Sequence, residues 1–361
     1  MEDAHNALLK DLVVVELASV LAGPAVGMFF AELGATVIKV ENKHTGGDIT
    51  RKWKLPSEDP IDPFSAYYHS INYGKKSIFL DLTEKKDIEV VWEWVKKADI
   101  VISNFKSDSA WNLGIDYDSL RKINDRIIYG YISAYGEHDS SPGFDAMIQA
   151  ETGWIDMTGE VDGKPVKLPV ALVDVMAGHQ LKQGILLALL KKEQTGKGSV
   201  VHVSLYDASI AALTNQASNW LNVGHLPRRL GTQHPNIAPY GDVFTTSDGV
   251  TIILGTGTQL QFENLCHCLN LVKLLDSDLY KDNTARLRNR TQLCEILAQA
   301  FKELTYTQLK VRSTEKKVTL AQVKNMEEVF ENPAAQDLIL ERKLDDGSIV
   351  KSVRTAIFTI K

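Results

Sequence analysis

Residues 13–41 read VVVELASVLAGPAVGMFFAELGATVIKVE, and this stretch carries the clearest signal of the fold class. Residues 12–17 are rich in β-branched side chains and carry one charge, which is typical of a buried parallel strand. Residues 21–35 predict a turn and a helix, because a proline is tolerated in a first turn and Gly34 lies where the helix should end. Residues 36–41 form a second short apolar run. The order strand, helix, strand predicts the first unit of a doubly wound parallel sheet.

The same alternation continues along the first half of the chain. Three further strand-like runs and an amphipathic helix follow, the strands at residues 75–82, 99–105 and 126–135 and the helix at 84–98. We therefore expect an α/β protein with a doubly wound, Rossmann-like parallel sheet in a large domain. In such a sheet, ligands bind beyond the carboxyl ends of the strands.

The composition changes after residues 194–221. This segment predicts a strand and one long helix, which we interpret as a connector out of the first domain. Residues 239–256 predict two antiparallel strands around the turn SDG, and helical patterns follow. We expect a large domain over 1–200, a connector over 201–225, a smaller α+β domain over 226–316, and a C-terminal return to the large domain over 317–361.

Charge and cysteine content narrow the class of protein. The 361 residues carry a net charge of −6, which argues against a nucleic-acid partner, because such partners need a basic surface. The three cysteines, Cys266, Cys268 and Cys294, form no CxxC pair, so we predict neither a zinc site nor a disulfide framework. No metal-binding pattern occurs, and the N-terminus has neither a secretory signal nor a membrane-spanning run. We expect a cytoplasmic protein without a metal and without a membrane partner.

Common cofactor and nucleophile motifs are missing. The first turn reads ASVLAGPAVG at residues 18–27, which is not the GxGxxG of a dinucleotide site. The chain has no GxSxG elbow for a catalytic serine. His234 lies in the loop GTQHPNIAPY, where we interpret it as a structural or surface residue.

Basic residues gather at or beside the predicted strand ends. If they lie along one edge of the sheet they would suit a phosphorylated, nucleotide-like ligand, and otherwise they form a solvated rim. They are Lys39, Lys43, Arg51, Lys52, Lys75, Lys76 and Lys106.

A single aspartate, Asp174, stands in the apolar stretch KLPVALVDVMAGHQ at residues 167–180. Burying an unpaired acid costs several kcal/mol, so its presence needs a reason. One interpretation is the N-cap of a helix that follows a strand. The other is a carboxylate nucleophile held at the end of that strand.

Several segments, taken in order, resemble the family III CoA-transferases, the group that includes formyl-CoA and carnitine CoA-transferases. They cover most of residues 11–245, and the last third of the chain fits more loosely. The segments are residues 13–41, GGDITRKW, NYGKKSIFLDL, ADIVISNF, GIDYDSL, PGFDAMIQAETG, ALVDVMAGHQ, GKGSVVHVSLYDA and HPNIAPYG.

The resemblance implies that Asp174 is the catalytic aspartate. It would attack an acyl-CoA donor to give an aspartyl anhydride and then an aspartyl-CoA thioester, from which a carboxylic acid acceptor takes the CoA. Backbone N–H groups at the start of the following helix would stabilise the oxyanions. The fold implied is an interlocked homodimer, and coenzyme A is a substrate, so residues 1–200 would form the CoA-binding domain. The CoA contacts implied are Val20, Ala22, Asn42, Lys43, Leu80, Asn104, Phe105 and Lys106.

The chain departs from the family pattern at several places. Asn42, Trp111 and Asn112 stand where the family often has a basic residue. No glycine-rich loop that would close over the site is visible, and the chain ends sooner after RTAIFTIK than in many relatives. Phosphate recognition would therefore depend on Lys43 and Lys106.

Two other functions share this sequence pattern. A 2-methylacyl-CoA racemase of the same fold needs a histidine in a GHD motif, but here the motif is GFD with Phe144, which cannot carry a proton. A non-catalytic CoA-binding protein would not need Asp174. Hydrolysis of the acyl-CoA is a possible side reaction.

The acceptor acid is less defined by the sequence. We expect its pocket to involve the loop at 231–240 together with Met147, Gln149 and Trp154. Arg228 and Arg229 would bind the second carboxylate of a diacid or belong to a solvated connector.

Overall fold

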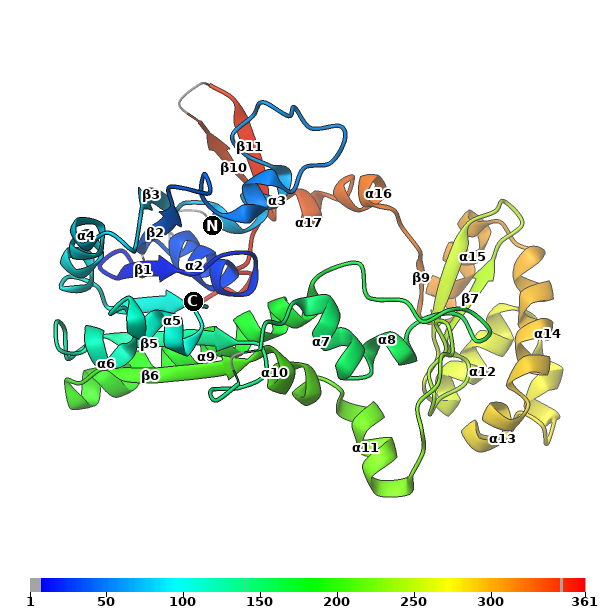
Figure 1. The fold of residues 1–361 in the computed structure, drawn as a ribbon. Coiled ribbons are helices and arrows are strands. Elements are labelled where there is room, and N and C mark those ends of the chain that lie inside the picture. Colours follow the sequence, from blue (N-terminus) through cyan, green and yellow to red (C-terminus); the bar gives the residue numbers. More distant parts are fainter. Residues whose placement is uncertain (1–7, 140, 345–346, 361) are drawn as a thin grey trace. The chain divides into compact units, whose positions relative to one another are not determined.

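The computed structural model describes residues 8–139, 141–344 and 347–360, and the chain forms two compact units (Figure 1). The first unit contains Met1–Trp154, Lys167–Leu226 and Ala334–Lys361, and the second contains Ile155–Val166 and Pro227–Pro333. Within the described ranges, no helix combines the length and the apolar character needed to cross a bilayer.

A six-stranded parallel sheet forms the centre of the first unit, in the order β3-β2-β1-β4-β5-β6. This order confirms the predicted doubly wound α/β fold. It reverses between β1 and β4, and such a reversal is where ligands bind in this class of sheet. The strands are β1 Val13–Leu17, β2 Thr36–Asn42, β3 Lys76–Leu80, β4 Ile100–Ser103, β5 Ile128–Ser133 and β6 Ser199–Ser204.

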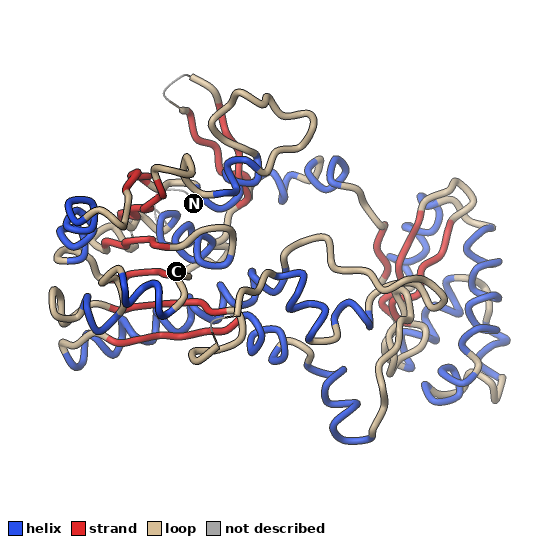
Figure 2. The backbone as a smooth tube through the Cα atoms, viewed as in Figure 1, coloured by secondary structure: helices blue, strands red, loops and turns tan. Residues whose placement is uncertain are grey.

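Helices cover both faces of this sheet, as Figure 2 shows with strands in red and helices in blue. One core packs α2 and α9 against the sheet, with Val26, Phe30 and Leu181 fully buried; the other includes Val91 and Leu120 from the opposite face. The expected single long helix after β6 is wrong, because α10 and α11 form two separate helices. The helices are α2 Ala22–Glu32, η1 Ile49–Lys52, α3 Ala66–Asn72, α4 Lys85–Val95, α5 Ser107–Asn112, α6 Tyr117–Leu120, α7 Asp145–Glu151, α9 Leu172–Thr195, α10 Leu205–Ala211 and α11 Thr214–Val223.

Helices α2 and α9 approach each other closely at a glycine. A Cβ atom at Gly178 would lie 3.1 Å from the carbonyl oxygen of Ala22, so a larger residue would push the helices apart. Gly178 follows Asp174 by one turn. The close approach therefore fixes the start of α9 against the first βα turn.

Buried ion pairs occupy much of the predicted basic rim. The Lys39 ammonium lies 2.8 Å from Glu16 and 3.0 Å from Asp48, and Lys75 lies 2.7 Å from Glu16. The predicted grouping of these lysines as an anion-binding edge is wrong, because strand β1 supplies a carboxylate directly beside Lys39 in the sheet register. Isolated buried charges are costly, so the lysines stay paired.

Arg51 is the third member of that predicted rim that the fold buries. Its guanidinium donates two hydrogen bonds to Glu41, at 2.7 and 2.6 Å, and one to the hydroxyl of Tyr68 at 2.7 Å. A bidentate pair of this kind fixes both side chains.

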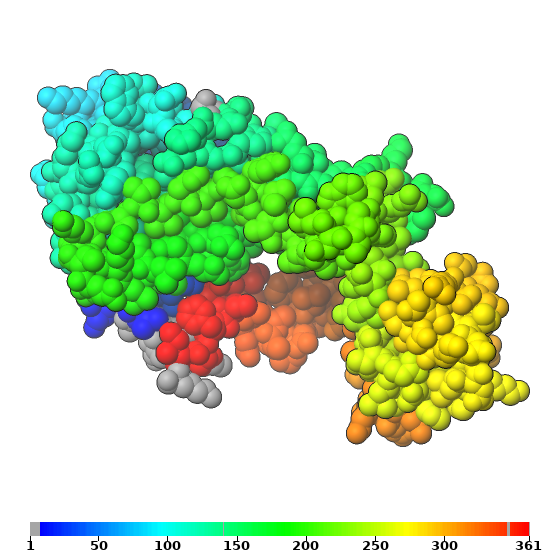
Figure 3. Space-filling model, turned by 90° about the horizontal axis from the view of Figure 1, so that it is seen from below, coloured from blue at the N-terminus to red at the C-terminus, as the bar shows by residue number. Residues whose placement is uncertain are grey.

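The C-terminal segment lies against α2 and α3 of the same unit. Glu32 accepts hydrogen bonds from the backbone N–H groups of Thr355 and Ala356, and the Ser352 hydroxyl donates to the carbonyl oxygen of His69. Figure 3 shows these last residues in red beside the blue N-terminal part of the chain. The strands of this segment, β10 Ile339–Lys343 and β11 Ile349–Val353, form an antiparallel hairpin.

The second unit has a three-stranded antiparallel sheet in the order β7-β8-β9, which confirms the predicted pair around the turn SDG. Its core contains Phe262, Leu297 and Phe301, together with the buried Cys266 and Cys268. Its elements are β7 Tyr240–Thr245, β8 Thr251–Gly255, α12 Gln259–Cys268, η2 Val272–Asp276, α13 Asn283–Arg288, α14 Arg290–Lys302, α15 Tyr306–Glu315, β9 Leu320–Gln322 and α16 Met326–Phe330. Two short helices, α8 Trp154–Met157 and α17 Pro333–Gln336, each contain a boundary between the two units.

The loop that contains His234 is held by local hydrogen bonds. The ring Nδ1 of His234 accepts from the backbone N–H of Asn236, and Arg290 donates to the His234 carbonyl oxygen at 2.7 Å. The His234 ring also packs edge-on against Tyr240. These contacts agree with a structural role for this histidine.

Candidate active site

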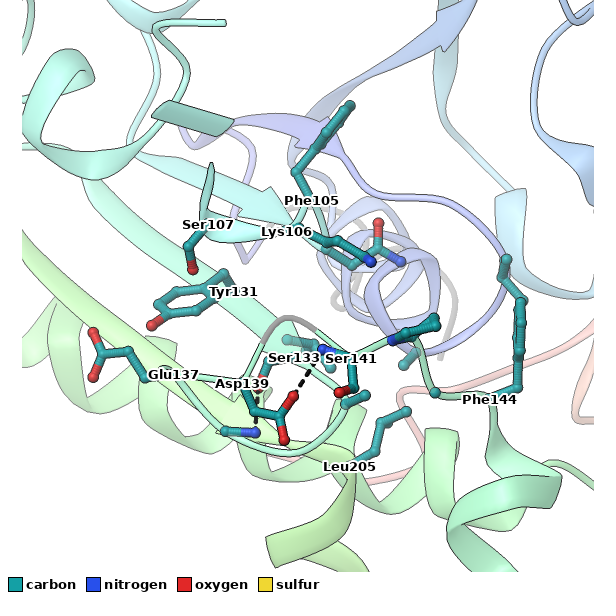
Figure 4. A pocket seen from close by; sticks show the side chains of 18 of the residues that line it. Phe105, Lys106, Ser107, Tyr131, Ser133, Glu137, Asp139, Ser141, Phe144 and Leu205 are labelled. Carbon is teal, nitrogen blue, oxygen red and sulfur yellow. Dashed lines mark hydrogen bonds between the residues drawn. The ribbon is translucent and has the colours of Figure 1, made fainter. Parts of the chain in front are cut away.

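A cavity of about 490 Å³ lies in the first unit beyond the carboxyl ends of β1, β4 and β5. Its position is the reversal point of the strand order, where doubly wound sheets bind ligands. In Figure 4, Phe105 and Lys106 lie at the top of the cavity and Asp139 and Leu205 at the bottom. The cavity brings together Val20, Ala22, Asn104, Phe105, Lys106 and Asp174 from the set named by sequence.

The first βα turn is held in a strained conformation at the cavity wall. Val20 has φ of 72°, which a β-branched residue rarely adopts. Its backbone N–H donates to the Asp48 carboxylate at 3.2 Å, and Asp48 is held in turn by the buried Lys39. Strain of this kind persists only where surrounding contacts enforce it, and it is concentrated at functional sites.

Asn104 joins the loops that follow β1 and β4. Its side-chain oxygen accepts from the Ser19 N–H at 3.1 Å, and its amide donates to the Ser19 carbonyl at 2.8 Å. The next two residues, Phe105 and Lys106, line the cavity, and Lys106 forms no ion pair with any described residue. The Lys106 ammonium is therefore available to an anionic ligand.

Asp174 lies in the first turn of α9, and both sequence-based placements of it need correction. The N-cap of α9 is Ala171, and residues 159–171 form an irregular loop rather than a strand. The N-cap and strand-end interpretations are therefore wrong. Asp174 nevertheless lines the cavity, and its side chain is only 7% exposed.

Another carboxylate performs the capping role at α9. The Asp145 side chain accepts from the backbone N–H of Val173 at 2.8 Å and of Asp174 at 3.4 Å, and from the Gln149 amide at 2.6 Å. Gln149 also accepts from the Leu168 N–H and is completely buried. The expectation that Gln149 lines an acceptor pocket is therefore wrong, since both ends of its amide hold other groups in place.

The same contacts exclude the predicted oxyanion site at the start of α9. The N–H groups of Val173 and Asp174 are taken by Asp145, and the Leu172 N–H donates to the Val170 carbonyl. Oxyanion stabilisation needs donors that are free to reach the reacting oxygen. This part of the sequence-based mechanism is wrong.

The electrostatics around Asp174 favour its protonated form. Burial, with a smaller contribution from the charge of Asp145, raises the pKa of Asp174 to about 7. Among the described residues none donates a hydrogen bond to its carboxylate. Once ionised, this carboxylate has neither a hydrogen-bond donor nor a counter-charge to quench its nucleophilicity.

Tyr67 interacts electrostatically with Asp174, although no sequence motif selects it. Burial and then the charges of Asp174 and Asp145 raise the pKa of Tyr67 to about 12, so its phenol stays protonated. The rings of Trp53 and Tyr67 pack edge to face with centroids 5.2 Å apart. Only the tertiary fold shows that Tyr67, on α3, is close enough for the charges of the two acids to act on it.

The remaining residues of the sequence-based CoA set lie at the ends of β2 and β3, outside the lining of the cavity. Asn42 and Leu80 are register partners in the sheet. The ammonium of Lys43 lies 2.9 Å from the carboxylate of Asp87, and this hydrogen bond raises the pKa of Lys43. An anion bound at Lys43 would have to replace Asp87. Their role in binding CoA stays a prediction.

The part of the cavity wall that β5 forms carries a polar cluster, which is completed by His202 of the neighbouring β6. The Ser133 hydroxyl lies 2.8 Å from the ring Nε2 of His202, and it accepts from the Gly136 N–H. Tyr131 stacks on His202 with ring centroids 4.4 Å apart. Burial, then a hydrogen bond with Glu137, raises the pKa of Tyr131. Figure 4 shows Tyr131, Ser133 and Glu137 around the cavity.

Within the described part of the chain, no three histidine, cysteine, aspartate or glutamate side chains are placed to hold a metal ion. The ionisable side chains that line the cavity include Asp174, Glu137, Tyr131 and Lys106.

A sequence profile described as CoA-transferase family III matches residues 9–360. The chain belongs to this family. The match covers nearly the whole chain, including the C-terminal third, where the family motifs fit less closely. It confirms the resemblance that the motifs of residues 11–245 indicated.

The curated relatives of this family III protein include two named for succinate and glutarate. The succinate–glutarate CoA-transferase of Agrobacterium fabrum is 37% identical over 97% of this chain and 88% of the relative. The human succinyl-CoA:glutarate CoA-transferase is 33% identical over 90% of this chain and 74% of the relative.

A solved structure shares both the fold and the sequence. The crystal structure of a CAIB/BAIF family protein from Brucella suis superposes with a TM-score of 0.84 at 36% identity, covering 98% of this chain and 93% of that one. Similarity at this level places the doubly wound sheet, the second unit and the C-terminal segment in the architecture of this family.

Proposed function

We propose that this family III protein transfers CoA from an acyl-CoA donor to a carboxylic acid, with Asp174 as the covalent nucleophile. One observation carries the proposal. The Asp174 carboxylate is buried, accepts no hydrogen bond from the described residues, and lines the cavity at the reversal point of the sheet. A structural carboxylate would be hydrogen-bonded or paired, as Asp145 is.

The first half of the reaction exchanges an acyl group for CoA on Asp174. The carboxylate attacks the thioester carbonyl, a C–O bond forms, the C–S bond breaks, and the CoA thiolate leaves an aspartyl anhydride. The thiolate then attacks the Asp174 carbonyl of the anhydride. This step releases the donor acid with one oxygen from Asp174 and leaves an aspartyl-CoA thioester. No net hydrolysis occurs, so the thioester energy is retained.

The second half runs the same two steps with the acceptor acid. The acceptor carboxylate attacks the aspartyl-CoA carbonyl and displaces the thiolate, and the thiolate attacks the acceptor carbonyl of the new anhydride. The acceptor leaves as its CoA thioester, and Asp174 is regenerated with an oxygen from the acceptor. We assign the phenol of Tyr67 as the neutral donor to the oxyanions, because it stays protonated and the charges of Asp174 and Asp145 act on it.

The bound CoA would extend along the sheet edge from the cavity. Val20, Ala22, Asn104 and Phe105 would contact its inner part, and Lys106 would neutralise phosphate. Beyond the cavity, we propose that the nucleotide end of CoA contacts Asn42, Lys43 and Leu80. The Lys43 ammonium would then exchange Asp87 for a phosphate oxygen.

Dicarboxylic acids are the substrate class that we assign. The support is the naming of two relatives for succinate and glutarate at 37% and 33% identity. Within the second unit, Arg229 already contacts Asp156, with 3.0 Å to its carbonyl oxygen and 3.4 Å to its carboxylate. Arg228 is therefore the better of the two candidates for a second substrate carboxylate.

Racemisation by a two-base mechanism is disfavoured by the cavity wall. Phe144 lines the cavity and is 57% exposed, in the position where a racemase would need a histidine. A benzyl side chain transfers no proton. Asp174 alone cannot serve both faces of an α-carbon.

The protein would act as a homodimer. Large apolar side chains are exposed on α9 and α11, among them Leu187 at 66%, Leu190 at 62%, Leu221 at 78% and Val223 at 77%. Helix faces of this kind are usually covered by a partner. We assign a second copy of this chain as that partner.

Initial-rate measurements test the transfer and its nucleophile. Succinyl-CoA and glutarate should give glutaryl-CoA and succinate with ping-pong kinetics, because the donor acid leaves before the acceptor reacts. The rate should rise with pH through about 7, as the pKa of Asp174 requires. Asp174→Asn should abolish transfer, and Asp118→Asn on α6 is the matched control. Full activity in Asp174→Asn would overturn the proposal.

A further inference from the structure

A second cavity, of about 520 Å³, lies between α3, β3 and the β10–β11 hairpin of the first unit. It shares no lining residue with the active-site cavity. Its volume falls in the range of pockets that enclose small organic ligands. The proposed transfer reaction gives this cavity no role.

The second cavity is lined by basic side chains and by no acidic ones among the described residues. Arg51, His69, Lys75 and Arg342 line it, and none of its described lining residues is an aspartate or a glutamate. The chain as a whole carries a net charge of −6, so a wall free of acids is unusual here. A lining of this composition favours an anionic ligand.

Arg342 is the cation that this cavity leaves available. The other two basic groups, Arg51 and Lys75, are already paired with carboxylates, Arg51 with Glu41 and Lys75 with Glu16. Arg342 is exposed, and it forms no ion pair with any described residue. Its hairpin register pairs it with Val350, which lines the same cavity.

His69 supplies a neutral polar group next to this arginine. Burial lowers the pKa of His69, so its ring is uncharged near neutral pH and can donate one hydrogen bond. Its backbone is fixed, since its carbonyl oxygen accepts from the Ser352 hydroxyl. The arginine and the imidazole therefore border the cavity from opposite elements, the hairpin and α3.

Aromatic rings form the rest of the wall. The Arg51 guanidinium carbon lies 4.7 Å from the ring centroid of Phe64, 4.0 Å from that of Tyr68 and 5.4 Å from that of Phe79. Phe79 is 47% exposed although it stands on a strand of the central sheet. An exposed ring beside a guanidinium offers a flat apolar surface on which another ring can stack.

We propose that the second cavity binds a small aromatic carboxylate, with the carboxylate on Arg342 and the ring against the exposed ring of Phe79. A carboxylate matches the planar fork of an arginine, and the aromatic body matches the flat wall. The site is separate from the catalytic cavity, and its existence does not depend on the transferase activity.

Calorimetric titration of the full-length protein with 2-naphthoate tests the site. 2-Naphthalenemethanol, which has the same rings without the charge, is the comparison ligand. We expect saturable binding of 2-naphthoate and at least tenfold weaker binding of the alcohol, because a charge-assisted pair is lost. Arg342→Gln should weaken 2-naphthoate binding by about tenfold or more.

Three further variants test whether the ligand occupies this cavity. Phe79→Leu keeps an apolar side chain but removes the ring, and it should weaken binding severalfold. Lys351→Gln alters the neighbouring hairpin strand, where Lys351 pairs with Glu341, and should leave affinity unchanged. Lys106→Gln, in the catalytic cavity, should also leave it unchanged.

Several results would overturn the proposal. They are no saturable binding of 2-naphthoate up to its solubility limit, equal binding of the alcohol, unchanged affinity in Arg342→Gln, or loss of binding in Lys106→Gln. The last result would place the ligand in the catalytic cavity. Because all readouts are heats of binding, none depends on whether the protein transfers CoA.

Discussion

Replacing Asp174 by asparagine should stabilise the first unit while it removes the nucleophile. Burial, together with Asp145, raises the pKa of Asp174 from 3.8 to about 7. An acid with a higher pKa in the folded state destabilises that state progressively as the pH rises from the unfolded to the folded value. At about 1.4 kcal/mol per pKa unit, ionised Asp174 costs the folded state about 4 kcal/mol above neutral pH. Asparagine has the same shape and no charge, so it avoids this cost.

Urea unfolding followed by far-UV circular dichroism measures this effect directly. The stability advantage of Asp174→Asn over the wild type should grow by about 3 kcal/mol between about pH 5 and about pH 8. Over most of that interval Asp174 is ionised in the unfolded wild type and still protonated in the folded one. Asp118→Asn, at an exposed position on α6, is the control and should show no such trend. An advantage that does not change with pH, or a wild type that is the more stable protein at pH 8, would show that the buried charge of Asp174 carries no such cost.

Three further substitutions test the contacts that hold the site. Val20→Gly should raise the free energy of unfolding by about 1 kcal/mol, because glycine adopts the left-handed conformation without strain; a lower melting temperature would contradict this. Gln149→Leu should lower the free energy of unfolding by about 1–3 kcal/mol, since the Leu168 N–H loses its acceptor; unchanged urea stability would count against it. Lys39→Met should cost about 3–5 kcal/mol by leaving the carboxylates of Glu16 and Asp48 without their shared ammonium; calorimetry showing a neutral effect would disprove the role of the buried network.

The strands of the first unit were predictable because their signal is local. Runs such as residues 13–17 and 100–103 are rich in β-branched side chains, and the core buries them on both faces. The family was predictable from the order of short motifs, and the profile match over residues 9–360 confirms it. Local pattern and motif order were therefore sufficient for the fold and the class of enzyme.

The details of the site depended on contacts between residues far apart in the chain. Asp174 resembled an N-cap, but the capping carboxylate is Asp145, 29 residues earlier. The charge of Asp174 acts on Tyr67, which lies on α3 far earlier in the chain. No local pattern encodes either interaction.

One signal for the buried ion pairs was present in the sequence. Glu16 is the single charge of β1, Lys39 is the one basic residue of β2, and the parallel register places them side by side. Opposite charges at matching positions of adjacent buried strands predict a pair rather than a ligand-binding rim. Lys106, by contrast, follows its strand and remains unpaired in the cavity.

Trapping of the acyl intermediate on Asp174 is the decisive experiment for covalent catalysis by this carboxylate. The protein is mixed with succinyl-CoA without an acceptor acid, quenched with hydroxylamine, digested, and mapped by mass spectrometry, with Asp174→Asn as the control. We predict a hydroxamate on Asp174 that depends on succinyl-CoA and is absent from the variant. CoA transfer to glutarate without any modification of Asp174, or with a hydroxamate on another residue, would contradict the proposed mechanism.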